Sequence, residues 1–306
     1  MIDNLISIFL LYILYNMKIY FLFFIFITIL LLVTINKSES NINAYGYKQT
    51  KINNLSEIIF DKKNFYTYKC VNFLSKTINN PKYLVVIFHG AIEEDKDKNP
   101  KDRIIFRGFN YTIDNCDILC ISDSLIQIYN QYKVGYCLST KKHNFEKIYL
   151  EIFKFYMKKN NYEKVLFAGS SAGGYPSIHF ASIFNQYALI SNSQLYLEDY
   201  PLFKDFHKNF NHIEKILYEN KNIEIQILKS KPKKIILYNN KFDKTYKIHT
   251  IPFINFIKKN NLLHILDLKL FEGNINLSKK RDHHLILYDK DSKKKLDNVI
   301  SEFLNK

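Results

Sequence analysis

Tryptophan is absent from this sequence of 306 residues, and glycine, proline and cysteine are scarce, with 8, 6 and 4 residues respectively. So few glycines and prolines exclude a long flexible linker rich in either residue, and no internal repeat is present. The cysteines lack the spacing of zinc ligands, so we interpret them as buried free thiols. We therefore expect a single folded domain without a metal site or another cofactor.

Acidic residues are also under-represented. The sequence has 29 of them against 44 lysines and arginines, and the formal net charge is +15. Such an excess can indicate a nucleic-acid or acidic-polymer partner. Here the lysines are scattered, and the short runs Lys231–Lys234 and Lys293–Lys295 are typical of solvated faces. The abundance of Asn, Ile, Tyr and Phe matches what AT-rich coding DNA produces. We expect no nucleic-acid partner, and the oligomeric state stays open.

Leu5–Ile35 is almost wholly apolar, and within it Ile19–Ile35 approaches the length that crosses a bilayer, about 17–25 residues. We predict a hydrophobic helix within residues 1–36 that acts as a single-pass membrane anchor, with its orientation open. The alternative is a cleaved secretory signal beginning at Met17, which would make the protein secreted. Residues 37–64 are polar and predict a tether, and residues 65–306 predict the folded domain.

Apolar runs alternate with helical patterns from Phe65 onwards. The predicted strands are Phe65–Leu74, Tyr83–Phe88, Asp117–Ile121, Lys164–Ala168, Tyr187–Ser191, Lys233–Tyr238 and Leu262–Phe271. The predicted helices span about 143–160, 172–185, 203–221, 248–260 and 290–305. This alternation predicts the α/β class, with a mostly parallel sheet and helices on both faces. Functional sites in such folds form at the carboxyl ends of the strands.

The most informative motif is Gly169-x-Ser171-x-Gly173, which ends an apolar run and begins a helical pattern. A serine on such a sharp turn needs small neighbours, because the strand and the helix crowd together there. In a chain with 8 glycines the motif is unexpected by chance. It predicts Ser171 as a nucleophile, whereas the simpler alternative is a turn that only joins a strand to a helix.

A serine nucleophile needs a histidine base and an acid that orients the histidine, and both are expected later in the chain. Asp243 follows the predicted strand Lys233–Tyr238 and is the candidate acid. The pair His283-His284 follows the last predicted strand. We favour His284 as the base, with His283 as the alternate.

The oxyanion of an acyl-transfer reaction needs main-chain N–H donors. Tyr83–Phe88 leads into His89-Gly90-Ala91, so we predict the amides of Ala91 and Ala172 as these donors. Other polar residues that follow predicted strands are expected to line the substrate pocket. These are His89, Asp123 and Gln194, although His89 also fits a packed structural role.

These motifs resemble those of the α/β-hydrolase superfamily. Short strings resemble more narrowly a group of bacterial α/β-hydrolase-like proteins associated with surface polysaccharides and glycan modification. The strings are Phe88-His89-Gly90-Ala91, Ile121-Ser122-Asp123, Gly169–Gly174, and Asn192-Ser193-Gln194 with Tyr200. The resemblance implies a catalytic triad of Ser171, Asp243 and His284. It departs from the group at His283, where a glycine usually precedes the histidine.

The expected function is a serine hydrolase or O-acyltransferase that works through an acyl-enzyme. The resemblance implies an ester or an acylated glycan as its substrate. The alternative function is that of a non-catalytic accessory protein in a polysaccharide-assembly or secretion complex, which keeps the fold but not the chemistry.

Overall fold

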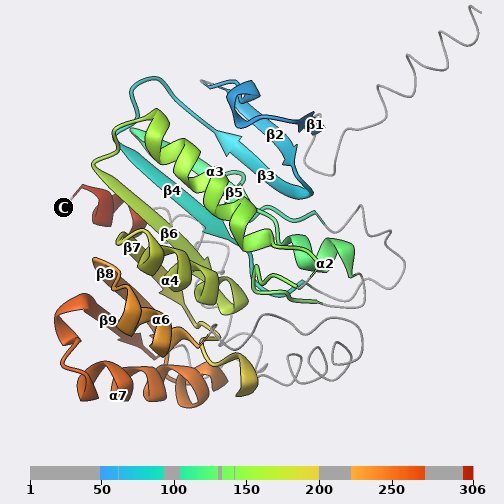
Figure 1. The fold of residues 1–306 in the computed structure, drawn as a ribbon. Helices are drawn as coiled ribbons and strands as arrows, with labels where there is room; N and C mark the ends of the chain where they lie inside the picture. The colour runs from blue at the N-terminus through green and yellow to red at the C-terminus, as the bar shows by residue number, and fades with distance from the viewer. Residues whose placement is uncertain are drawn as a thin grey trace, which may run out of the picture. The chain divides into compact units, whose positions relative to one another are not determined.

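The computed structural model describes residues 49–60, 62–92, 104–129, 133–140, 142–199, 222–272 and 299–305 (Figure 1). A nine-stranded sheet has the strand order β1-β2-β3-β5-β4-β6-β7-β8-β9. Its strands are β1 (Gln49–Ile52), β2 (Lys63–Tyr68), β3 (Val71–Lys76), β4 (Tyr83–Phe88), β5 (Cys116–Ile121), β6 (Lys164–Ser170), β7 (Tyr187–Ser191), β8 (Lys234–Asn240) and β9 (Leu266–Phe271). The run from β5 through β4 to β9 is parallel, whereas β3 pairs antiparallel with β2 and β5. The predicted α/β class and mostly parallel sheet are confirmed.

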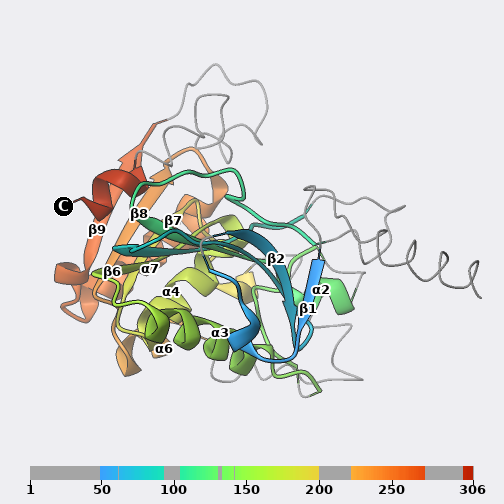
Figure 2. The same cartoon turned by 90° about the horizontal axis from the view of Figure 1, so that it is seen from above.

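Helices cover both faces of this sheet. The described α-helices are α2 (Ser124–Ile128), α3 (Phe145–Lys159), α4 (Gly174–Ile183), α6 (Ile223–Lys229) and α7 (Ile251–Lys259), and residues 299–304 are also helical. Figure 2 shows α3, α4 and α6 on one face and the C-terminal helical residues on the other. Because helices cover both faces of the sheet, a binding site can form at the carboxyl ends of the central strands.

Aromatic side chains fill the core between the sheet and the helices α3 and α4. All six residues of β4 are buried, as expected for a parallel strand covered on both faces. The ring centroids of Phe153 and Phe180 lie 5.0 Å apart, and those of Phe88 and Phe180 lie 5.7 Å apart. Phe153 also packs its ring edge against Phe167 at 5.5 Å. Contacts between offset or perpendicular rings add to the hydrophobic stabilisation of this layer.

Local sequence explains why α3 begins and ends where it does. The Asn144 side chain accepts a hydrogen bond from the Lys147 amide at 3.1 Å and caps the first turn. Lys158 and Lys159 lie in the last turn, where positive charge is favourable to the helix dipole. Buried residues recur at helical spacing along the side of α3 that faces the core. They are Phe145, Tyr149, Ile152, Phe153 and Tyr156.

The prediction of one strand over Phe65–Leu74 was wrong, because this segment folds as the hairpin β2–β3. The two strands pair in antiparallel register and are joined at Lys69 and Cys70. Both turn residues have positive φ, 45° and 67°. Two consecutive positive φ values define the tight turn that matches the twist of a hairpin. Neither residue is one that usually signals such a turn.

The described chain starts before Phe65, the residue at which the sequence predicted the domain to begin. Strand β1 and the 3-10 turn η1 (Leu55–Glu57) lie within residues 37–64. The predicted membrane helix at residues 1–36 and the predicted helix at 203–221 lie outside the described residues. Within the described part, no helix combines the length and apolar character that crossing a membrane requires.

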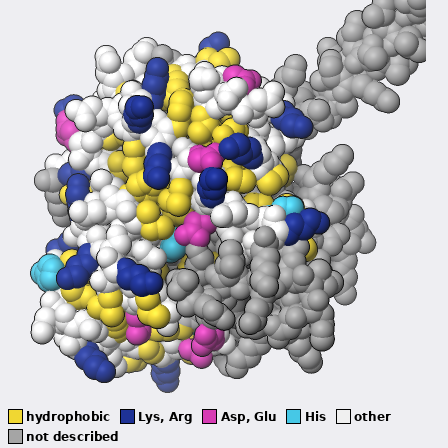
Figure 3. All heavy atoms as spheres, in the orientation of Figure 1, with side chains coloured by type: hydrophobic (Ala, Val, Ile, Leu, Met, Phe, Trp, Pro, Cys, Tyr) yellow, Lys and Arg dark blue, Asp and Glu magenta, His cyan; other side chains and the backbone are white. Residues whose placement is uncertain are grey.

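The face that carries α3 and α4 has lysine and arginine side chains spaced among acidic and hydrophobic ones (Figure 3). On this face the positive charge is dispersed and does not gather into one patch. Phosphate backbones are bound by clustered basic side chains, so this face offers no support for such a partner.

Candidate active site

Ser171 lies on a sharp turn between β6 and α4, within the 3-10 turn η3 (Ser171–Gly173). Its φ of 53° falls in the left-handed region, which is uncommon for a residue other than glycine. A Cβ atom at Gly169 would lie 2.2 Å from the Gly173 carbonyl oxygen, and one at Gly173 would lie 2.7 Å from the Phe88 carbonyl oxygen. Both glycines are therefore required by close approach of the backbone, as the motif predicted.

The parallel register brings the carboxyl ends of the central strands to the same edge. Phe88 of β4 pairs with Ile121 of β5 and with Gly169 of β6, and Ser191 of β7 pairs with Ser170 and Tyr238. The predicted site residues His89, Asp123, Ser171 and Asp243 each follow the end of one of these strands, and Gln194 follows β7. The structure thus gathers the predicted side chains at one edge of the sheet.

The turn after β4 adjoins the Ser171 side chain. A Cβ atom at Gly90 would lie 3.3 Å from the Ser171 Cβ and 3.9 Å from its Oγ. Ala91 follows in this turn, and Ala172 follows Ser171 at the start of the helix. Oxyanion stabilisation needs two main-chain donors, and we expect one from the turn after β4 and one from the residue after the nucleophile. The donor role itself stays a prediction.

The His89 imidazole is buried and uses both of its nitrogens. Its Nδ1–H donates to the Gly90 carbonyl oxygen at 2.6 Å, and its Nε2 accepts the Asp123 amide N–H at 3.0 Å. Burial lowers the pKa of His89, against the opposing effect of the nearby Asp123 carboxylate. His89 is therefore neutral and ties the Gly90 turn to the loop after β5. Contact of His89 with a substrate stays a prediction.

The Asp123 carboxylate is buried and accepts hydrogen bonds from main-chain amides. Its Oδ1 accepts from Leu125 at 3.1 Å, and its Oδ2 accepts from Gly135 at 2.8 Å and Cys137 at 3.3 Å. Burial raises the pKa of Asp123, whereas His89 and these amides oppose the rise. These bonds cap α2 and hold the loop at 133–138. Recognition of substrate hydroxyls by Asp123 stays a prediction.

Gln194 contacts the predicted nucleophile directly. Its Nε2 donates to the Ser171 Oγ at 3.2 Å, and its main-chain N–H donates to the Ser171 carbonyl oxygen at 2.9 Å. The Gln194 Oε1 accepts a hydrogen bond from the Tyr136 hydroxyl at 2.7 Å. Gln194 follows a predicted strand, whereas Tyr136 has no sequence signal, because its loop carries no motif and its path depends on the Asp123 hydrogen bonds.

Asp243 follows β8 and is buried, with 3% of its surface exposed. Its Oδ1 accepts hydrogen bonds from the Thr245 amide at 2.7 Å and from the Thr245 hydroxyl. The Lys241 amide donates to the Phe271 carbonyl oxygen at 2.9 Å, so the end of β9 lies beside the turn that carries Asp243. The candidate bases His283 and His284 come after β9 and lie outside the described residues.

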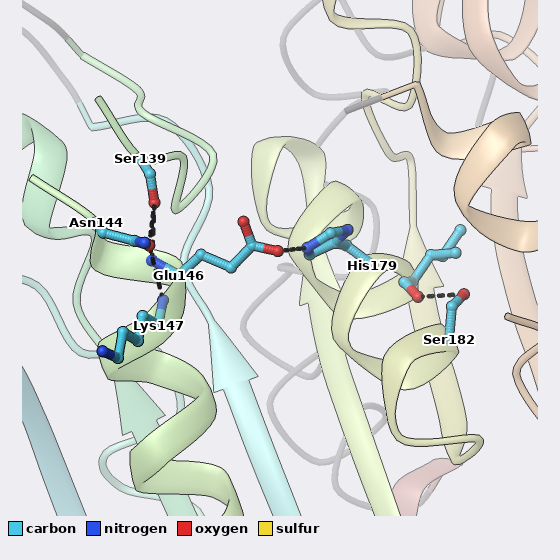
Figure 4. Close-up of polar contacts among 7 residues, drawn as sticks. Ser139, Asn144, Glu146, Lys147, His179 and Ser182 are labelled. Carbon is cyan, nitrogen blue, oxygen red and sulfur yellow. Dashed lines mark hydrogen bonds and ion pairs between the residues drawn. The ribbon is translucent and has the colours of Figure 1, made fainter. Parts of the chain in front are cut away.

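Two other histidines have structural partners. His179 of α4 binds Glu146 of α3 through Nε2 at 2.9 Å, as Figure 4 shows. Its ring also stacks on Tyr175, with centroids 5.9 Å apart. The Nδ1 of His249 accepts the Tyr196 amide N–H at 3.3 Å. Burial lowers the pKa of His179 and of His249 to about 4. The described residues contain no cluster of three or more His, Cys, Asp or Glu side chains that could hold a metal ion.

The fold resembles that of solved hydrolases and acyltransferases. Two structures of the capsule O-acetyltransferase of Neisseria meningitidis serogroup A match with TM-scores of 0.54 and 0.52, both at 14% sequence identity. They cover 79% and 82% of this chain and 94% and 98% of their own. The first of them is a complex with caged gadolinium.

A structure of Porphyromonas gingivalis dipeptidyl peptidase 4 matches with a TM-score of 0.55 at 13% identity. It covers 80% of this chain and 35% of its own. No family model matches the sequence, and no curated protein matches it. At such identities these similarities establish the fold alone. The chain has an α/β-hydrolase fold, which confirms the fold that the sequence resemblance implied.

Proposed function

We propose that this protein is a serine hydrolase or O-acyltransferase that acts through an acyl-enzyme on Ser171. The observation that carries the proposal is the φ of 53° at Ser171, between a strand and a helix. A non-glycine residue in this conformation is costly, by about 1–3 kcal/mol, and such strain is found at functional sites. The Gly90 turn lies close to the Ser171 side chain, which supports the proposal that this turn contributes an oxyanion donor.

In this mechanism a histidine, His284 or the alternate His283, takes the proton of the Ser171 hydroxyl. Ser171 Oγ attacks the carbonyl carbon of an ester, while the amides of Ala91 and Ala172 stabilise the oxyanion. The alcohol leaves with the proton, and Asp243 orients the histidine throughout. Water or a sugar hydroxyl then takes the acyl group from Ser171.

An acylated glycan is the substrate that we favour. Two of the structural neighbours are named as a capsule O-acetyltransferase, which transfers an acyl group in connection with a capsule. As part of the proposal, residues 1–36 tether the domain to a membrane or direct its secretion, since Leu5–Ile35 is almost wholly apolar.

The proposal is tested by labelling with a fluorophosphonate probe, which reacts with activated serines. We expect wild type to be labelled and Ser171→Ala to be unlabelled. Ser170→Ala is the matched control, because it removes the neighbouring hydroxyl at the end of β6 and should leave labelling intact. Equal labelling of wild type and Ser171→Ala would reject the proposal, as would loss of labelling only in the Ser170 variant.

A further inference from the structure

Both polar atoms of the Gln194 side-chain amide form hydrogen bonds. Its amide nitrogen donates to the Ser171 Oγ at 3.2 Å, and its amide oxygen accepts from the Tyr136 hydroxyl at 2.7 Å. Gln194 is 2% exposed, so little solvent competes for these bonds. In this arrangement the oxygen of the amide faces the Tyr136 hydroxyl and the nitrogen of the amide faces Ser171.

The backbone around Gln194 is held as firmly as its side chain. The Asn192 amide donates to the Tyr238 carbonyl oxygen at 3.0 Å, and the Asn192 Oδ1 accepts the Asn240 amide at 2.8 Å. The Gln194 amide donates to the Ser171 carbonyl oxygen at 2.9 Å. These bonds connect the segment after β7 to β8 on one side and to the nucleophile turn on the other. Pre-organised groups of this kind act without reorganisation during a reaction.

A donor at Ser171 Oγ has a different effect from an acceptor. An acceptor at this position would compete with the catalytic base for the hydroxyl proton. A donor occupies one lone pair of the oxygen and leaves the proton free for the base. It also stabilises negative charge on the oxygen, and a hydrogen bond strengthens when its acceptor becomes charged.

We propose that Gln194 is a catalytic residue that stabilises developing negative charge on Ser171 Oγ, with Tyr136 as the positioning residue that holds its amide. This inference rests on the proposed function. It gives Gln194 a role at the nucleophile, which differs from contact with substrate hydroxyls. It adds a side-chain donor on Oγ to the main-chain donors expected for the carbonyl oxygen.

Both half-reactions place charge on Oγ. In acylation the base takes the Ser171 proton, Oγ forms a bond to the carbonyl carbon, and the π electron pair moves to the carbonyl oxygen. Collapse of this intermediate breaks the bond to the alcohol oxygen, which leaves with the proton from the base. In deacylation water or a sugar hydroxyl gives its proton to the base and attacks, and Oγ leaves and regains the proton. The Gln194 donor stabilises Oγ as attacking group and as leaving group.

The principal variant is Gln194→Met, which has a similar volume and lacks the donor. We expect its second-order rate of fluorophosphonate labelling and its kcat on p-nitrophenyl acetate to fall by about 10- to 100-fold, with KM changed by no more than about twofold. Neither reagent carries hydroxyl groups, so a role in binding substrate hydroxyls would leave both rates unchanged. That outcome would overturn the inference.

Two further variants separate catalysis from folding. Gln194→Met removes the amide oxygen that accepts the Tyr136 hydroxyl, and the double variant Tyr136→Phe/Gln194→Met removes that hydroxyl as well. We expect the double variant to unfold near the wild-type temperature and to stay slow. Tyr136→Phe alone keeps the donor but releases its orientation, so a smaller loss of kcat is expected. Wild-type rates in the double variant would refute the role of Gln194.

The two proposals fail in different ways. If wild type is labelled no faster than Ser171→Ala, the proposed function itself is rejected and Gln194 has no reaction to assist. If wild type is labelled and Gln194→Met is labelled equally fast, only the role of Gln194 is rejected.

Discussion

At the scale of single residues, the strained serine is supported by what surrounds it. Ser171 has a φ of 53°, and Gly169 and Gly173 permit backbone approaches that no Cβ atom would allow. The chain has 8 glycines in all, so using two of them at one turn is a notable share. Backbone strain of this kind persists only where contacts with the surrounding structure hold the strained residue in place. Within the described residues, this turn combines a serine at positive φ with glycines two positions before and after it, which supports a chemical role for Ser171.

The acid of the proposed triad gives a prediction for one residue. In Asp243→Asn the amide oxygen can still accept the Thr245 bonds, but the charge that orients an imidazole is lost. We expect kcat to fall by about 10³- to 10⁴-fold, as measured on p-nitrophenyl acetate, with an unfolding temperature close to that of wild type. Asp267→Asn on β9 is the control, because Asp267 pairs with Lys269 at a partly exposed position. Activity within a few-fold of wild type in Asp243→Asn would contradict the assignment.

Sequence reasoning located the nucleophile because its constraint is local. Ser171 is identified by small neighbours at fixed spacing, and Asp243 by its position in the polar turn that follows an apolar run. Tyr136 carried no such signal, since it reaches Gln194 only through a loop held by Asp123. The roles of Asp123 and His89 were equally hidden, because their polar atoms bond to main-chain groups of other elements.

At the scale of elements, the hairpin β2–β3 shows where reasoning from composition stops. Three of the six residues in each strand are polar, so Lys69 between the strands does not stand out as a break. Lys69 and Cys70 take positive φ values without the Asn-Gly or Asp-Gly pair that usually signals such a turn. Pairing of the flanking strands imposes this conformation against local preference. The parallel strands β4 and β7 were predicted with their observed bounds, because each is one apolar run ended by polar residues.

The hairpin turn yields a prediction about stability. Cys70 has a φ of 67° and an exposed side chain, so glycine at this position removes strain without removing a core contact. We expect Cys70→Gly to raise the free energy of unfolding by about 0.5–1 kcal/mol, measured by chemical denaturation. The matched control is Cys70→Ala, which loses the thiol but keeps the Cβ atom and the strain. Equal stability of the glycine and alanine variants would show that the turn is not strained.

At the scale of the whole described domain, parallel register turns residues that are far apart in sequence into neighbours. Polar residues after β4, β5, β6, β7 and β8 meet because these strands run in the same direction. The alternation of strands and helices predicted this edge in advance. Which polar groups face each other across it depends on loop paths, and those are set by hydrogen bonds between elements. Fold class was therefore readable from the sequence to a greater extent than the contacts in the site.

Buried neutral histidines predict how the stability of the domain depends on pH. His249 is 2% exposed and accepts the Tyr196 amide through Nδ1, and burial lowers its pKa from 6.5 to about 4. His89 likewise accepts a main-chain amide, and burial lowers its pKa too. Between pH 6.5 and 4 the unfolded chain binds protons that the folded protein does not. Stability is therefore complete above pH 6.5 and is lost as the pH falls towards 4.

For His249 alone this loss amounts to about 3 kcal/mol across that window. It is measured as the free energy of unfolding at a series of pH values. His249→Asn is the informative variant, because the amide oxygen of asparagine can accept the Tyr196 N–H but does not titrate. We expect this variant to lose less stability than wild type between pH 6.5 and 4, with the remaining slope due in part to His89. Parallel pH profiles of the two proteins would mean that His249 takes up its proton as readily in the folded chain as in the unfolded one, and that its burial has no energetic consequence.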